Sequence, residues 1–408
     1  MSTGVQPLRI PGFVFLLAAL TALAPLATDA YLPAVPTIAD ALSRSVHDVE
    51  LSISLFLAGF SIGQLVGGPF SDHFGRRTGI FIGLALFCSG SLAISFSQSI
   101  EWMWTMRIVQ AVGGGMTVVN TPAIVRDISG GRDSARTLSR MAIILMLAPM
   151  LAPLLGSLIL QTLGWRPIFI LLLIYGVILA VVIFRVLPET RIVQKDRPNA
   201  IKRYWMVLKS RYALGYLFSA CFAYGSLFAF ITGSPSVYMG YFELSETAYP
   251  FAFGANVFAL MIFNKLNIRL LGRHHPQKLL LAGQIIQLAT GLVLALYTLV
   301  SGAPTLPMFI LLIMLFFGCH GLVSANSMAG ITEIFPHNSA TATALMGACG
   351  FAFGALSGSL VGLVADGTPQ PMVLMMAACA ILAPATRLML QRGLPVAAET
   401  GLTPENPR

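Results

Sequence analysis

The stretch that decides the fold is residues 167–184, which read PIFILLLIYGVILAVVIF and contain no Asp, Glu, Lys or Arg. A helix rises about 1.5 Å per residue, so this run nearly crosses a bilayer hydrocarbon core of about 30 Å. The flanking residues extend the apolar segment to about 165–187. We therefore predict a transmembrane helix here.

The composition extends this conclusion to all 408 residues. Hydrophobic residues make up 56% of the chain and charged residues only 10%, whereas roughly a quarter of the residues in soluble domains are charged. So few polar side chains cannot coat a water-soluble globule, and the sequence predicts an integral membrane protein whose partner is the lipid bilayer. The net charge of +9 does not indicate a nucleic-acid partner, because the cations lie in short loops.

Twelve apolar segments are long enough to cross a membrane. They lie near 11–36, 48–71, 78–98, 102–127, 137–162, 165–187, 209–238, 246–271, 278–301, 305–330, 338–365 and 370–391. The first could be a signal peptide, but further hydrophobic segments follow it where a soluble domain would be expected. We therefore predict an all-α integral membrane protein with twelve transmembrane helices.

The distribution of positive charge predicts the orientation. With both termini in the cytoplasm, the inside segments hold 22 of the 25 Lys and Arg residues, and the outer loops hold only Arg44 and Arg166. Cytoplasmic loops of membrane proteins carry such an excess of Lys and Arg. We therefore expect cytoplasmic termini.

The longest polar stretch, 188–203, divides the chain into two halves. Pro33 and Pro235, like Gly156 and Gly358, are 202 residues apart, which is typical of diverged repeats. Two parallel six-helix repeats are a transporter architecture. We predict pseudo-symmetric six-helix bundles at 1–187 and 209–392, a cytoplasmic linker at 188–208 and a disordered tail at 393–408.

Motifs of enzymes and metal sites are missing from the sequence. The five cysteines are far apart in apolar runs, without the spacing of metal ligands. No zinc-protease, phosphate-loop or dinucleotide motif occurs, and the GxSxG pattern at 59–63 lies inside a predicted membrane helix. We expect no enzymatic activity, no metal and no cofactor, and an ion gradient as the energy source.

Two ionisable residues lie well within the predicted spans, Asp29 in the first and Arg107 in the fourth. Counted along their helices, both lie roughly 10 Å below the outer boundary and could face each other. An intramembrane charge is costly and marks a candidate functional site. A static ion pair is the alternative, but a carboxylate beside a movable arginine can change its protonation state. We predict that Asp29 and Arg107 couple transport to protons.

Further polar, aromatic and thioether residues of the spans are candidates for a substrate pocket. Asparagines in spans commonly form interhelical hydrogen bonds, and a lone histidine is usually a core residue, although His320 could titrate. Aromatic and methionine side chains suit an adaptable apolar pocket, while core packing explains any single one equally well. The candidates are Tyr31, Asn120, Met146, Met150, Tyr224, Phe228, Asn256 and His320.

Glycines recur every four residues on two spans, at 59, 63 and 67 and again at 350, 354, 358 and 362. Small residues on one face let helix backbones approach closely in lipid. Both static packing and two halves that rock against each other would use such faces.

Four motifs occur in order along the chain. They are Thr28 to Pro36 in the first span, Gly68 to Arg77 after the second, Arg107 to Gly113 in the fourth and Ala148 to Ser157 in the fifth. Together they resemble the major facilitator superfamily, and within it the twelve-helix drug:proton antiporters of the Bcr/CflA type. The departures are His73, where Arg or Lys is usual, and Ala111, Ala152 and Ser157, where glycine is usual.

The resemblance implies roles for particular residues. Asp29 matches the protonatable residue of the group, and Arg107 matches the arginine implicated in proton coupling. In the loop after the second span, Asp72 would act as a charge latch toward a helix N-terminus or a cation such as Arg132 or Arg136. The residues carried over are Gly68, Asp72, Gly75, Arg76 and Arg77 in this signature loop, and Pro149, Pro153 and Gly156 in the antiporter motif.

The function implied is proton-coupled efflux of drug-sized, partly apolar compounds across the bacterial inner membrane by a monomer that alternates its access. A dedicated exporter of a native metabolite or siderophore is the alternative in the same fold, and a non-transporting sensor is another. An intramembrane enzyme would need a reactive set at one depth, and only Asp29 and Arg107 share one. No short motif identifies the substrate.

Overall fold

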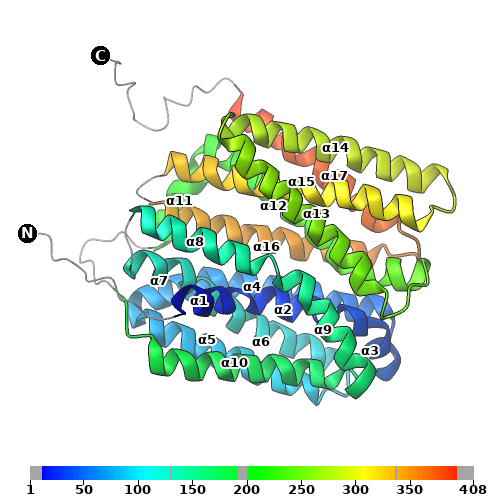
Figure 1. The fold of residues 1–408 in the computed structure, drawn as a ribbon, viewed down its shortest axis with the longest axis horizontal. Helices are drawn as coiled ribbons and strands as arrows, with labels where there is room; N and C mark the ends of the chain where they lie inside the picture. The colour runs from blue at the N-terminus through cyan, green and yellow to red at the C-terminus, as the bar shows by residue number, and fades with distance from the viewer. Residues whose placement is uncertain (1–11, 129–130, 192–199, 336–337, 393–408) are drawn as a thin grey trace, which may run out of the picture. The chain divides into compact units, whose positions relative to one another are not determined.

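The computed structural model describes residues 12–128, 131–191, 200–335 and 338–392. Within these ranges the chain is helical and contains no β-strand (Figure 1). Twelve helical segments there are long and apolar enough to cross a membrane. The predicted all-α fold with twelve transmembrane helices is therefore confirmed, whereas the predicted tail, 393–408, lies outside the described residues.

The chain divides into two compact units. The first comprises the residues up to Asp196 together with Ser234–Gly254, and the second comprises Arg197–Gly233 and the residues from Ala255 onward. The division thus falls inside the predicted linker, and a segment from the second half of the sequence packs with the first unit.

Most of the first unit consists of the helices that precede the linker. They are α1 (Phe13–Thr21), α2 (Leu23–Asp29), the 3₁₀ helix η1 (Leu32–Ala34), α3 (Val35–Ala41), α4 (Val46–Phe74), α5 (Arg76–Ser95), α6 (Ile100–Val118), α7 (Asn120–Ile128), α8 (Gly131–Leu145), α9 (Ala148–Leu163) and α10 (Arg166–Val186). The π-helix η2 (Ser236–Tyr241) and the first turns of α13 complete this unit.

The second unit contains the remaining helices. They are α11 (Ala200–Lys209), α12 (Arg211–Pro235), α13 (Tyr249–Leu271), α14 (Pro276–Val300), α15 (Leu306–Ile334), α16 (Ser339–Leu363) and α17 (Gln370–Gln391). Helix α11 begins inside the predicted linker and ends one residue beyond it, and its Val207 is fully buried in the core of this unit with Tyr212 and Tyr216. The apolar face that carries Val207 is enough to dock this short helix.

Prolines break the first membrane span into α1, α2, η1 and α3. A proline has no N–H, so the carbonyl four residues earlier loses its helical partner, and the residue before the proline disfavours the helix. Pro25 therefore accounts for the break after Thr21, and Pro33 and Pro36 account for the break after Asp29. The second break leaves the Asp29 carboxylate at a helix end inside the span.

Glycines bring α4 and α6 into backbone contact. A Cβ on Gly59 would lie 2.8 Å from the carbonyl oxygen of Ile108, and a Cβ on Gly63 would overlap the carbonyl of Val112. A Cβ on Gly67 would lie 2.6 Å from the Cα of Met116, one turn further along α6. Because both helices belong to the first unit, close packing within that unit accounts for this stripe.

The second glycine stripe also packs within its own unit. Gly350 and Gly354 on α16 face the rings of Tyr224 and Phe228 on α12, which leave no room for an added Cβ. Ser357, one turn further along, donates a hydrogen bond to the Gly225 carbonyl at 2.7 Å. These contacts join α12 to α16 through small residues.

Gly63→Ala should lower the thermal stability of the purified protein. The added methyl group must displace the Val112 carbonyl, which costs about 1–3 kcal/mol and exceeds the gain in helix propensity of about 1 kcal/mol. Thermal unfolding in detergent measures the difference. Gly362→Ala is the matched control, because no atom lies within 4 Å of its added Cβ. Equal unfolding temperatures for the two variants would contradict close packing of α4 on α6.

Candidate proton-coupling site

Asp29 is a buried carboxylate at the last residue of α2. It is 3% exposed, and its Oδ1 accepts a hydrogen bond from the Thr28 hydroxyl at 2.8 Å. The same hydroxyl lies 3.0 Å from the carbonyl of Ala24 one turn earlier, which orients it along the helix. The proline-induced helix break therefore presents a single acidic group within the span.

Arg107 on α6 is fully buried, and its side chain contacts the backbone of α2. Its Nη1 donates to the carbonyl of Ala27 at 3.0 Å and to Oε1 of Gln110 at 2.9 Å. The last carbonyls of a helix lack partners within the helix and attract cations. Among the described residues the guanidinium forms no ion pair with Asp29, so it contacts the carbonyl two residues before the predicted partner.

Aromatic rings enclose the same guanidinium. Its central carbon lies 4.4 Å from the ring centre of Tyr31, 4.6 Å from that of Phe56 and 5.8 Å from that of Phe169. The negative faces of aromatic rings stabilise a cation that has lost its water. Nε and Nη2 of Arg107 have no hydrogen-bond partner in the described part of the chain, so two donors are available to a carboxylate.

The contacts of Arg107 extend through a polar chain across three helices. Gln110 donates from Nε2 to the Ser91 hydroxyl at 2.8 Å, and Ser91 donates to the carbonyl of Phe87 on α5 at 2.7 Å. The Tyr31 hydroxyl lies 2.9 Å from that of Ser52 on α4. Tyr31, predicted as a pocket residue, is thus part of the surroundings of Arg107.

The antiporter motif on α9 packs against the chain next to Asp29. Gly156 leaves no room for a Cβ, because an added methyl group would overlap the carbonyl of Ala30. Pro149 lies in the first turn of α9 and Pro153 lies inside the helix, which is tolerated when neighbouring groups satisfy the freed backbone. Gly156 therefore sets how closely α9 approaches the break that follows α2.

The signature loop forms a charge cluster around Arg76. The guanidinium lies 2.7 Å from Asp72 on α4 and 3.0 Å from Asp127 on α7, and it donates to the Ser71 hydroxyl at 2.8 Å. Asp72 is therefore paired with a residue of its own loop, whereas the side chain of Arg132 lies outside the described part. The cation that pairs with Asp72 in the structure is Arg76, and its bonds join α4, α5 and α7.

A second carboxylate holds the start of α5. Gly75 adopts a φ of 105°, a conformation that favours glycine, and an added Cβ would lie 2.5 Å from Oε2 of Glu189. Glu189 accepts hydrogen bonds from the backbone N–H groups of Arg76 at 2.9 Å and Arg77 at 3.1 Å. A carboxylate at a helix N-terminus satisfies free donors and offsets the helix dipole. Arg77 also donates to the Phe184 carbonyl at 2.7 Å.

The second unit holds an aromatic cluster with a histidine. The Tyr224 ring centre lies 5.5 Å from that of His320, 6.2 Å from that of Phe228 and 5.7 Å from that of Phe351. His320 is 7% exposed, its ring bonds to the backbone of Ala223, and its Nδ1 has no partner among the described residues. The structure therefore brings three of the predicted pocket residues together.

The other predicted pocket residues lie on helices that do not carry this cluster. Asn120 is fully buried at the start of α7 and donates from Nδ2 to the Met116 carbonyl at 2.7 Å. Met146 and Met150 lie where α8 passes into α9 and are half-buried. Asn256 is fully buried on α13.

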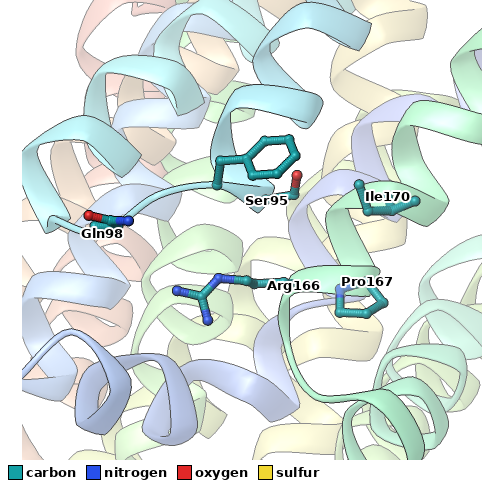
Figure 2. A pocket seen from close by; sticks show the side chains of 6 residues that line it. Ser95, Gln98, Arg166, Pro167 and Ile170 are labelled. Atoms are coloured by element: carbon teal, nitrogen blue, oxygen red, sulfur yellow. The ribbon is translucent and has the colours of Figure 1, made fainter.

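A separate pocket opens beside the end of α5 and the start of α10. Its volume is about 350 Å³, and its lining is Ser95, Phe96, Gln98, Arg166, Pro167 and Ile170. Figure 2 shows the Arg166 side chain extending beside Pro167, with Ser95 and Gln98 across from it. Arg166 donates to the Ser97 carbonyl at 3.2 Å. No predicted site residue lines this pocket.

Several residues of these sites could not be found by sequence reasoning. Gln110 and Phe56 resemble ordinary span residues, and their contact with Arg107 depends on which helix faces meet. Asp127 and Glu189 resemble loop charges, yet both bind the signature loop. Glu50 occupies the beginning of a span, and only its 1% exposure marks it as unusual.

Twelve candidate membrane spans with a buried carboxylate and a buried arginine are typical of a polytopic membrane transport protein. The chain belongs to the Major Facilitator Superfamily, whose family description matches residues 17–359. This match and the relatives described next confirm the predicted resemblance to this superfamily and to its Bcr/CflA group.

Two bacterial proteins and one solved structure resemble the whole chain. A bicyclomycin resistance protein homolog of Haemophilus influenzae is 32% identical over 91% of this chain and 94% of its own length. A chloramphenicol resistance protein of Pseudomonas aeruginosa is 29% identical over 88% of this chain and 84% of its own. An inward-facing, unoccupied bacterial homolog of the human lysosomal transporter Spinster shares the fold with a TM-score of 0.74, at 13% identity over 97% of this chain and 99% of that chain.

Arg107→Lys should lower both thermal stability and transport. Lysine keeps the charge but lacks the planar group that lies over three rings while bonding to Ala27 and Gln110. We expect a loss of about 2 kcal/mol in the free energy of unfolding. Arg166→Lys is the matched control, because that guanidinium also lies over a ring, at 4.4 Å from Trp165, but is exposed. Equal losses for both substitutions would argue against a special role for the buried arginine.

Glu189→Gln should destabilise the start of α5. The amide can still accept a hydrogen bond but removes the negative charge beside two backbone donors, at a cost of about 0.5–1 kcal/mol that salt diminishes. The loss in the free energy of unfolding is measured by unfolding the protein in detergent at low and at high salt. The control is Glu333→Gln, an exposed carboxylate in the last turn of α15, where removal of negative charge should not destabilise. A salt-independent effect of Glu189→Gln would contradict the electrostatic explanation.

Proposed function

We propose that this protein is a drug:proton antiporter of the bacterial inner membrane. It exports drug-sized, partly apolar compounds as a monomer by alternating access, with both termini in the cytoplasm and without a bound cofactor. The observation that carries the proposal is Asp29, a carboxylate 3% exposed at a helix break inside a span. The resistance proteins among the relatives support drugs as the class of substrate.

Asp29 has the properties that a coupling site needs. A buried carboxylate without a paired cation binds a proton more readily, and a cation that moves close favours its release. Arg107 already contacts the Ala27 carbonyl and has two free donors, so a small shift of α2 relative to α6 can exchange that carbonyl for the carboxylate. The proton then enters from the outside, substrate leaves, and proton loss to the cytoplasm resets the site.

The aromatic residues of the second unit support a partly apolar substrate. Tyr224, Phe228 and Phe351 form a cluster with His320, whose Nδ1 offers one polar position. Aromatic rings with a few polar groups bind chemically varied compounds of drug size. A dedicated exporter of one metabolite or siderophore in the same fold would instead accept a narrow set of compounds.

Uptake into everted membrane vesicles tests the function. Vesicles that contain the protein should accumulate bicyclomycin or chloramphenicol when respiration acidifies their lumen, and an uncoupler should abolish the accumulation. Transport of several unrelated drugs would support the broad antiporter. Transport of a siderophore or nucleoside alone would replace it by the dedicated exporter, and transport of no compound in the panel would count against efflux.

Asp29→Asn should abolish proton-driven accumulation of the drug. The amide has nearly the shape of the carboxyl group and keeps an oxygen for the Thr28 hydroxyl, but it cannot ionise. Drug exchange between the two sides without a gradient should persist, because it needs no net proton movement. Asp366→Asn, which alters an exposed loop carboxylate, is the control. Uphill transport by Asp29→Asn at the level of this control would exclude Asp29 as the sole proton carrier.

A further inference from the structure

Glu50 is a buried carboxylate that the proposed cycle does not use. Helix α4 begins at Val46, after the Ser45 cap, and the first turns of a helix usually expose a glutamate to water. Glu50 is instead 1% exposed. A buried carboxylate is costly unless hydrogen bonds or opposite charge compensate the lost hydration. The partners of Glu50 therefore determine how stable its ionised form is in the first unit.

Both oxygens of Glu50 have partners within the first unit. Oε1 accepts a hydrogen bond from the backbone N–H of Ser236 at 3.0 Å, and Oε2 lies 3.1 Å from Nδ1 of His47. Ser236 begins η2, so the first contact joins α4 to the segment Ser234–Gly254. The His47 side chain is 32% exposed and can exchange protons with water. Glu50 thus lies between a solvent-accessible imidazole and a backbone donor.

Tyrosines connect Glu50 with Asp29. The hydroxyl of Tyr249 interacts electrostatically with both carboxylates and lies 2.7 Å from the Ser234 hydroxyl. A change of charge at either carboxylate therefore acts on the tyrosine that faces both. The titratable groups that face Glu50 are His47 on its own helix, Tyr31 beside η1 and Tyr249 on α13. Behind these tyrosines lie Arg107 on α6, beside Tyr31, and Asp29 on α2 and Tyr238 on η2, beside Tyr249.

We propose that Glu50 is a second proton-binding carboxylate and that its protonation releases η2 from α4 on the predicted outer side. A proton from the outer water binds the exposed Nε2 of a neutral His47, the Nδ1–H bond then breaks as an O–H bond forms at Oε2, and the net uptake of one proton leaves a neutral imidazole and a neutral carboxyl group. A neutral carboxyl accepts the Ser236 N–H more weakly than a carboxylate does. Acid on the outer side therefore loosens this end and opens a path toward Asp29. The inference rests on the proposed orientation and coupling.

The accessibility of a cysteine next to Ser236 tests this inference without any substrate. Val237 on η2 is 2% exposed, so Val237→Cys, in a chain whose five native cysteines are replaced by alanine, reports release of η2. Bacterial spheroplasts are labelled from outside with a membrane-impermeant maleimide from about pH 4.5 to about pH 8, where carboxyl and imidazole groups titrate. Labelling is normalised to the denatured protein at each pH, because thiol reactivity itself depends on pH.

Labelling of the chain with Glu50 intact should rise as the outer pH falls. Glu50→Gln should label about tenfold faster at pH 8 and lose the pH dependence, because the amide mimics the protonated carboxyl group. Glu50→Asp should keep a pH dependence, and Glu101→Gln, an exposed carboxylate paired with Arg44, should behave like the parent chain.

Two results would overturn the inference. One is pH-independent labelling of the parent chain, which needs no Glu50 variant to fold. The other is labelling of the Glu50→Gln variant that depends on outer pH in the same way as labelling of the parent chain. Vesicle transport separates this inference from the function itself: the expected labelling in a protein that moves no compound of the panel would support Glu50 as a proton switch and reject efflux.

Discussion

The Arg107 guanidinium is the interaction on which the first unit depends, because a charge without water must find all its partners inside the protein. It is fully buried, and its contacts reach the backbone of α2, a ring before η1, and side chains on α4, α6 and α10. Through Gln110 they extend to α5. The position of α6 therefore fixes the backbone of α2 two residues before Asp29.

Close contact between helix backbones is the second feature that positions the site around Asp29 and Arg107. Lipid supplies no hydrophobic force between helices, so close van der Waals contact must replace it, and glycine permits the closest approach. Gly59 and Gly63 bring α4 onto α6, and Gly156 brings α9 onto the carbonyl of Ala30. Gly156 therefore cannot be enlarged without displacing the Ala30 carbonyl. The proline breaks of the first span then expose carbonyls to these neighbours instead of to lipid.

Carboxylates at both ends of the first unit perform related tasks. Glu189 binds the first backbone donors of α5, and Glu50 binds the first backbone donor of η2. In each case an acidic side chain far away in sequence binds a backbone donor of another helix, and for Glu189 this is electrostatically favourable because helix N-termini carry partial positive charge. Such contacts are strong while the carboxylate is ionised and weaker when it is neutral. They are therefore suited to transitions that respond to protons.

The sequence by itself determined the number of spans, the candidate intramembrane charges and the family, because apolar length, isolated ionisable residues and ordered motifs are local properties of the chain. Asp29, Arg107, Gly156 and the signature loop could all be identified this way. Only the tertiary structure decided that Arg107 bonds to the Ala27 carbonyl, that Arg76 pairs with Asp72, that Glu50 accepts the Ser236 N–H and that Glu189 holds the start of α5. These contacts join residues separated by up to 186 positions, and they depend on which helix faces meet, which no local pattern encodes.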